Sequence, residues 1–244
     1  ERIIGSWFKA RGNRSKVVLA TKVAGRSPMN WLRSDGSPTE QTPKQIQEAV
    51  DSSLKRLQTD YIDLYQLHWP DRPVSMFGAT GLTYKHVEGS TVPIDEILGA
   101  LQTQVKAGKI RHIGLSNETA WGTMEFLRHS SAKGLPRIQS IQNAYNLINR
   151  VFEMGQAEIS MREHVGLLAY SPLAQGYLTG KYQKGALPEG SRKKLFNRLQ
   201  RYEKPQTEPA IDRYLGIARQ HNIDPTQLAL QFVTTRPFVT ANII

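Results

Sequence analysis

Six short runs of apolar and β-branched residues recur along the chain, separated by segments with helical periodicity. The runs lie at 17–23, 61–69, 110–117, 138–144, 165–173 and 238–244. Strands that alternate with helices are typical of βαβ units and predict an α/β fold with a parallel sheet. Two architectures remain open. One is an open doubly wound sheet, and the other is a (β/α)8 TIM barrel with about six of its eight strands present. No Gly-x-Gly-x-x-Gly sequence follows the first run, although an open sheet that binds a dinucleotide usually carries it.

The segments between the runs carry helix start signals. Thr42 is a predicted N-cap, with Pro43 in the first helical position and Gln45 closing a capping box, and 224–227 repeats this pattern. Apolar residues then share one helical face and are expected to pack on the sheet, for example at 46, 50, 54 and 57. Two irregular segments, 70–93 and 176–209, interrupt the alternation, and a long loop after a parallel strand is often functional.

Composition excludes several classes of protein. The 244 residues include no cysteine, so disulfides, zinc-thiolate sites and cysteine nucleophiles are ruled out, and the histidines show no metal-binding spacing. The net charge is +11, but the basic residues are scattered, with the densest stretch at 191–201, and no nucleic-acid motif accompanies them. No apolar run is long enough to cross a membrane. We therefore expect one domain over 1–244 in a soluble, cytoplasmic protein that binds neither nucleic acid nor membrane.

Polar side chains stand where the predicted strands end. They are Lys22, His68, Ser116, Asn117, Gln142, Asn143, Tyr170 and Ser171. The carboxyl ends of the strands of a parallel barrel meet on one face, where active sites are built. Side chains alternate along a strand, so Lys22 and His68 can both point inward.

Each of these residues also has a structural interpretation. Lys22 fits a solvated surface charge, and His68 fits a hydrogen-bonded residue without a catalytic role. Asn117 fits a cap of the following helix, and Tyr170 fits the core. The residues taken one at a time do not decide between these interpretations.

Three long motifs resemble the aldo-keto reductases. They are LKRLQTDYIDLYQLHWPDRP at 54–73, GKIRHIGLSNE at 108–118 and AYSPLAQGYLTGKY at 169–182, and ATKV at 20–23 matches the family's lysine strand. The resemblance runs from about residue 14 to the end, in the family's order. The loop at 70–93 and the ending FVTANII are most similar to Tas-type reductases. The resemblance implies a (β/α)8 barrel and NADPH-dependent reduction of small aldehydes or ketones.

The resemblance also implies roles for individual residues. Lys22 and His68 match two members of the family's catalytic tetrad, while its Asp and Tyr are expected upstream of residue 1, with the first two barrel strands. Position 1 is Glu rather than Met, and the chain is expected to be truncated at both ends and inactive by itself. The implied cofactor-binding residues are Ser116, Asn117, Gln142, Tyr170, Ser171, Pro172, Leu173, Gln175, Gly176, Lys181 and Arg192.

Two other functions remain open at this stage. The potassium-channel β subunits are more distant relatives in the same superfamily, and they suggest a nicotinamide-binding regulatory subunit. An inactive fragment without the catalytic Asp and Tyr is the other alternative. The sequence carries no signal for the physiological substrate, for NADP over NAD or for the oligomeric state.

Overall fold

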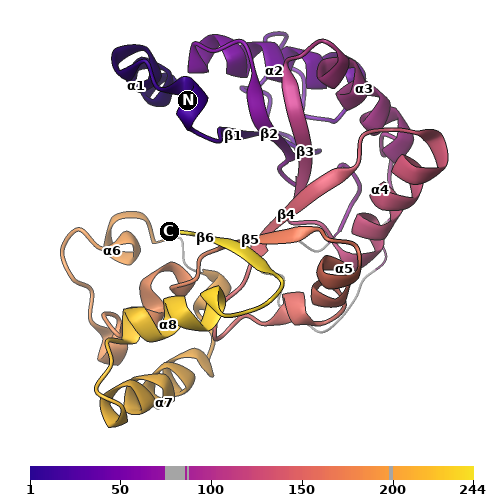
Figure 1. The fold of residues 1–244 in the computed structure, drawn as a ribbon. Coiled ribbons are helices and arrows are strands. Elements are labelled where there is room, and N and C mark those ends of the chain that lie inside the picture. Colours follow the sequence, from indigo (N-terminus) through magenta and orange to yellow (C-terminus); the bar gives the residue numbers. More distant parts are fainter. Residues whose placement is uncertain (75–85, 87, 198–199) are drawn as a thin grey trace. The chain divides into compact units, whose positions relative to one another are not determined.

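The computed structural model describes residues 1–74, 86, 88–197 and 200–244. Within these ranges the strands follow one another in chain order, β1-β2-β3-β4-β5-β6 (Figure 1). Their bounds are β1 Ala20–Val23, β2 Ile62–Leu67, β3 Ile110–Ser116, β4 Ile138–Ala144, β5 Gly166–Tyr170 and β6 Val239–Ile243. The pairs β1–β2, β2–β3 and β5–β6 run parallel, which confirms the predicted parallel α/β sheet. Residues 75–85 and 87, part of the loop predicted to be functional, lie outside the described residues.

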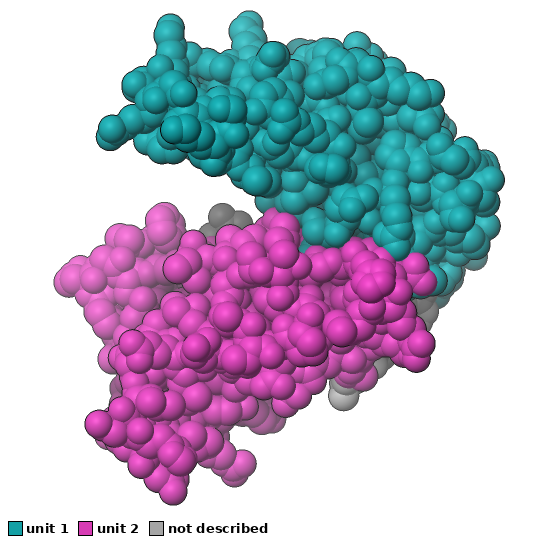
Figure 2. All heavy atoms as spheres, viewed as in Figure 1, with its two compact units in different colours: residues 1–74, 86–141 teal, residues 75–85, 142–244 magenta. Residues whose placement is uncertain are grey.

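The chain divides into two compact units (Figure 2). The division falls inside β4. The first holds 1–74 and 86–141, and the second holds 142–244. Helices and 3-10 turns of the first unit are α1 Arg2–Arg11, η1 Arg14–Lys16, α2 Pro43–Leu57, α3 Ile94–Lys106 and α4 Ala120–Lys133. Helices α2, α3 and α4 lie beside β1, β2 and β3 in Figure 1, with α2 against β1 and α3 against β3. Each unit therefore has its own packed core.

Helix α2 begins where its sequence predicts. The Thr42 hydroxyl accepts a hydrogen bond from the Gln45 amide, and Pro43 occupies the first turn. Three members of the predicted apolar stripe, Ile46, Val50 and Leu57, are buried against the rest of the unit. The predicted capping box is wrong in its second half, because the Gln45 side chain accepts from the Glu40 amide, 2.8 Å away. Local sequence signals thus predict where the helix starts, but the Gln45 side chain binds a residue outside the helix.

The amino-terminal ends of β1–β3 are joined by one carboxylate. Asp63 Oδ2 accepts from Arg14 at 2.8 Å and from the Leu19 amide at 2.9 Å, and Oδ1 accepts from Arg111 at 2.8 Å. Both guanidinium groups also stack on the Tyr61 ring, at 3.9 and 4.0 Å from its centre. Burial by itself raises the pKa of Asp63, but the hydrogen bonds outweigh it and the pKa is lowered. This end of the sheet is therefore held by buried charge.

The second unit surrounds a core rich in tyrosine. Its helices and 3-10 turns are η2 Val151–Glu153, α5 Gln156–Arg162, η3 Ala174–Thr179, η4 Gln183–Gly185, α6 Arg192–Phe196, η5 Gln200–Tyr202, α7 Thr207–Gln220 and α8 Pro225–Thr234. Tyr177, Tyr182 and Tyr202 pack with Ile211 of α7 and Ala229 of α8. Helix α8 begins at the predicted cap, because Asp224 accepts from the two amides that follow Pro225. In the part of the chain that the structure describes, no helix has the length and hydropathy to cross a membrane.

Candidate active site

Lys22 lies near the carboxyl end of β1, on the face of the sheet opposite the helices. The alternate residue Thr21 points the other way and donates to Glu1 at 2.6 Å, and Val23 is buried. Lys22 is in register with Gln66 of β2, so both side chains share one face. Partial burial lowers the pKa of the Lys22 ammonium. Lys22 is therefore half-buried and is not the fully solvated charge of the structural interpretation.

His68 follows β2 directly and is fixed through its main chain. Its amide donates to the Val23 carbonyl at 2.8 Å, and its carbonyl accepts from the Asn117 side chain at 2.9 Å. Burial, and then the charge of Lys22, lower the pKa of His68 to about 4. The imidazole is thus neutral at pH 7, with one nitrogen carrying a proton that it can donate. Because the charge of Lys22 lowers the pKa of His68, the two side chains lie close enough to interact electrostatically.

Ser116 and Asn117 end β3 next to His68. Asn117 has a left-handed backbone, with φ 54°, which turns its side chain back toward the strand end. Its amide nitrogen donates to the His68 carbonyl and lies 3.1 Å from the buried Ser116 hydroxyl. The helix-cap interpretation of Asn117 is wrong, because Thr119 caps α4 by accepting from the Gly122 amide at 3.1 Å. The first unit therefore brings Lys22, His68, Ser116 and Asn117 together.

In the second unit, Gln142 lies half-buried in β4 and Tyr170 ends β5. Burial raises the pKa of Tyr170, although the nearby Arg201 guanidinium opposes this shift. That guanidinium lies 5.3 Å from the centre of the Tyr170 ring. Tyr170 is therefore only partly buried and has a cation beside its ring. Neither feature is typical of a residue that serves only in the apolar core.

The segment after β5 forms a tight turn with an unusual backbone. Ser171, Ala174, Gln175 and Gly176 all have positive φ, of 56°, 48°, 58° and 101°. Leu173 lies between Ser171 and Ala174 and has φ −92° and ψ 13°, so a right-handed residue is followed by three residues with positive φ. Two amides donate within the turn, Ala174 to the Ser171 carbonyl and Gly176 to the Leu173 carbonyl, each at 2.9 Å, so the turn is held by its own main chain. Pro172 lies in the same turn and is buried.

Two further features of this turn concern Gln175 and Gly176. The Oε1 atom of Gln175 is buried and has no hydrogen-bond partner among the described residues. The φ of 101° at Gly176 strains any residue with a side chain, and a Cβ there would lie 3.1 Å from the flexible Lys181 Nζ. The turn thus places a cation, the Lys181 ammonium, beside the Gly176 backbone.

Arg192 is exposed at the start of α6, and its neighbour Lys193 is the one that packs. Lys193 Nζ lies 2.9 Å from the Tyr177 hydroxyl and 3.3 Å from Glu203. Sequence reasoning missed Lys193 and Arg201 as candidates. Both lie in the dense basic stretch at 191–201, which was the available signal, but nothing in that stretch distinguishes one cation from another.

The whole chain, residues 1–244, matches the profile of a family described as the aldo/keto reductase family. The protein tas of Escherichia coli (strain K12) is 48% identical over 246 residues, which cover 100% of this chain and 70% of that protein. An aldo-keto reductase of Babesia bovis is 43% identical, over 94% of this chain and 85% of that protein. The aldo-keto reductase yakc [NADP(+)] of Schizosaccharomyces pombe is 32% identical, over 96% of this chain and 62% of its own.

Proposed function

Because the chain belongs to the aldo/keto reductase family, we propose that it reduces aldehydes or ketones to alcohols with NADPH. Membership also decides between the two architectures that the strand pattern left open. The family folds as a (β/α)8 barrel, and the six parallel strands are part of one. As part of the same proposal, residues 1–244 belong to a single reductase domain.

The observation that carries the proposal is that Lys22, at the end of β1, lies close enough to His68 for its charge to lower the histidine pKa. When hydride reaches a carbonyl carbon, negative charge develops on the carbonyl oxygen, and a fixed donor stabilises it. A histidine whose pKa is about 4 keeps one N–H at pH 7 and stays neutral, so it can donate to that oxygen. In this proposal His68 orients the carbonyl and polarises it.

Lys22 acts on the proton donor. In the family this donor is a tyrosine, and a nearby ammonium favours the phenolate and lowers the tyrosine pKa. The matching Tyr and Asp are not among residues 1–244, so we expect these residues alone to reduce carbonyl compounds slowly or not at all.

The residues present fit a dinucleotide cofactor, which supplies the hydride when bound. The turn at 171–176 matches the family's loop around the pyrophosphate, and the Lys181 ammonium beside Gly176 offers a positive charge for it. The family match assigns a carboxamide contact to Ser116 and Asn117 of the first unit and, separately, to Gln142 of the second unit, where Tyr170 offers a ring face. A preference for NADPH agrees with the net charge of +11 and with the printed name of the S. pombe relative. Arg192 is a further phosphate contact in this proposal.

Cofactor binding can be measured on the 244-residue chain itself. We expect NADPH to quench the protein's tryptophan fluorescence, and Lys181→Met to weaken binding about tenfold through loss of one charge-assisted contact. Lys184→Met removes a cation from the neighbouring η4 turn and serves as the matched control. Equal affinity for NADPH in both variants would remove the turn from the proposed cofactor site.

Turnover is tested in a longer protein in which a segment with the family's Asp and Tyr is placed ahead of residue 1. With that protein and a panel of small aldehydes and ketones, we expect NADPH to be consumed. His68→Ala lowers kcat about 10–1000-fold, by analogy with the loss of an oxyanion donor, and leaves NADPH affinity unchanged. No consumption with any carbonyl compound, or an unchanged kcat in His68→Ala, would overturn the proposed function.

A further inference from the structure

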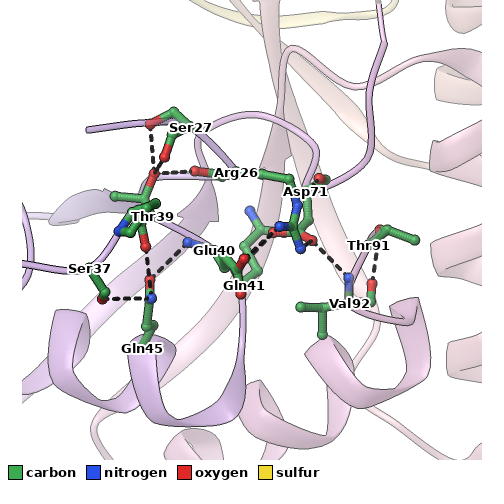
Figure 3. A network of polar contacts seen from close by, with 12 residues as sticks. Arg26, Ser27, Ser37, Thr39, Glu40, Gln41, Gln45, Asp71, Thr91 and Val92 are labelled. Atoms are coloured by element: carbon green, nitrogen blue, oxygen red, sulfur yellow. Dashed lines mark hydrogen bonds and ion pairs between the residues drawn. The ribbon is translucent and has the colours of Figure 1, made fainter. Parts of the chain in front are cut away.

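Asp71 is a buried carboxylate three residues after His68, and it is only 3% exposed. Its Oδ1 accepts from the Gln41 amide at 2.9 Å, and its Oδ2 accepts from the Val92 amide at 2.8 Å. Arg26 lies 3.1 Å from Oδ2 and also donates to the Asp71 carbonyl. Figure 3 shows the carboxylate between Gln41 and Val92, with Arg26 against it. One side chain therefore joins the loops that follow β1 and β2 to the residues preceding α2 and α3.

The same loops hold Trp69, the residue next to His68. Gln41 Nε2 donates to the Trp69 carbonyl at 3.0 Å, and the Trp69 indole donates to the Arg26 carbonyl at 3.1 Å. The backbone of Gly25 also approaches closely, since a Cβ there would lie 2.2 Å from the Trp69 carbonyl oxygen. Trp69 is thus fixed at both its main chain and its side chain by residues that Asp71 holds.

We infer that Asp71 is a positioning residue for His68. The Asp71 contacts fix Gln41 and Arg26, these two fix Trp69, and Trp69 sets the direction in which the His68 imidazole leaves the strand. Pro70 adds to this rigidity, because it lacks an amide hydrogen and restricts Trp69 to extended conformations. The inference rests on the proposed role of His68 as the group that orients the carbonyl.

The chemistry at Asp71 requires a carboxylate. Both of its oxygens accept hydrogen bonds from main-chain amides that lie outside helices and strands, and a guanidinium compensates the charge. An amide side chain keeps one acceptor and places an NH2 group against an N–H donor or against Arg26. Asp71→Asn therefore loses contacts on one side while keeping nearly the same volume, and the loops separate at that point.

The test is a titration of His68 by nuclear magnetic resonance in the 244-residue chain. Burial and the Lys22 charge hold the pKa of His68 at about 4, and both depend on the placement of the ring. In Asp71→Asn we expect the pKa to rise by about one unit or more, because a ring that moves gains water and leaves the ammonium.

Asp63→Asn is the matched control. Asp63 is also a buried carboxylate that accepts from a main-chain amide and from arginine, but it lies at the amino-terminal end of β2. We expect it to lower the melting temperature by a similar amount without changing the His68 pKa. A shift of the same size in both variants means that lost stability moves His68, and it would overturn the inference.

Gln41→Met keeps the experiment informative if Asp71→Asn does not fold. It removes the bond to the Trp69 carbonyl but keeps the main-chain bond from Gln41 to Asp71, so a smaller rise of the His68 pKa is expected. No rise in Gln41→Met when Asp71→Asn is unfolded would also refute the positioning role.

Activity separates this inference from the proposed function. In the longer protein, Asp71→Asn should lower kcat for carbonyl compounds several-fold and leave the KM for NADPH unchanged. If His68→Ala keeps full turnover while Asp71→Asn still shifts the His68 pKa, the proposed catalytic role fails and the positioning contact stands. If the His68 pKa does not move in Asp71→Asn but His68→Ala abolishes turnover, the positioning role of Asp71 fails and the proposed catalytic role of His68 stands.

Discussion

Lowering the pH should destabilise the folded chain through His68. The pKa of His68 is lowered to about 4 in the fold from an ordinary value of 6.5, first by burial and then by the Lys22 charge. Between these two values the unfolded chain binds a proton at His68 and the folded chain does not. The free energy of unfolding therefore rises with pH across this window, and the stabilising contribution is lost as the pH falls from about 6.5 to about 4.

The magnitude follows from the size of the shift. Each unit of pKa corresponds to about 1.4 kcal/mol, so the shift of His68 represents about 3 kcal/mol if fully expressed below pH 4. Between pH 7 and pH 5, the part of this free energy that is lost is about 2 kcal/mol before any allowance for solvent screening. Because His68 keeps partial contact with solvent, which screens the charge of Lys22, we reduce the expected loss of unfolding free energy to about 1 kcal/mol.

Urea unfolding at pH 7 and pH 5 measures this contribution. Between pH 7 and pH 5 the free energy of unfolding should fall by about 1 kcal/mol more in the unsubstituted protein than in the His68→Gln variant. The reason is that glutamine binds no proton. The exposed His221 provides the control variant His221→Gln, which should keep the full pH dependence. An equal fall of the unfolding free energy in the unsubstituted protein and in the His68→Gln variant would refute the reasoning. His68 would then bind protons as readily in the folded state as in the unfolded state.

Three further outcomes are expected. Asp63→Asn should lower the free energy of unfolding by about 2–3 kcal/mol in urea, because Arg14 and a buried amide lose their charged partner. Tyr65→Phe should leave stability unchanged or raise it by about 1 kcal/mol, because the buried Tyr65 hydroxyl has no hydrogen-bond partner in the described part of the chain. Lys22→Met should raise the pKa of His68 by resonance titration and keep NADPH affinity within about threefold by fluorescence, while turnover of the longer protein collapses.

The strand positions could be predicted because their signal is local. The run at 138–144 coincides with β4, and the other five runs each contain one strand. Their ends were predicted too long where specific contacts stop the strand. At 165–173, Ser171 turns into a left-handed conformation and ends β5 at Tyr170. At 17–23, the Leu19 amide binds the Asp63 carboxylate, and β1 starts one residue later. Apolar periodicity carries no information on either event.

The candidate site was predictable in one respect. Strand alternation and the ends of parallel strands placed Lys22 and His68 on the same face. The amide contact from Asn117 to the His68 carbonyl joins residues 49 positions apart, and the contact of Asp71 with Gln41 spans 30. Such pairings depend on how the loops fold over one another, so a single sequence gave no sign of them. The function of every predicted site residue, Lys22 and His68 included, stays a prediction.

The Asp71 contacts have a consequence for the exchange of amide hydrogens with solvent. The amides of Gln41 and Val92 lie outside every helix and strand, in positions where exchange is ordinarily fast. Each donates instead to a carboxylate that is almost fully buried. Their hydrogens can exchange only when these loops separate, so the rate of that local opening becomes visible at two amides in the deuterium uptake of the native protein.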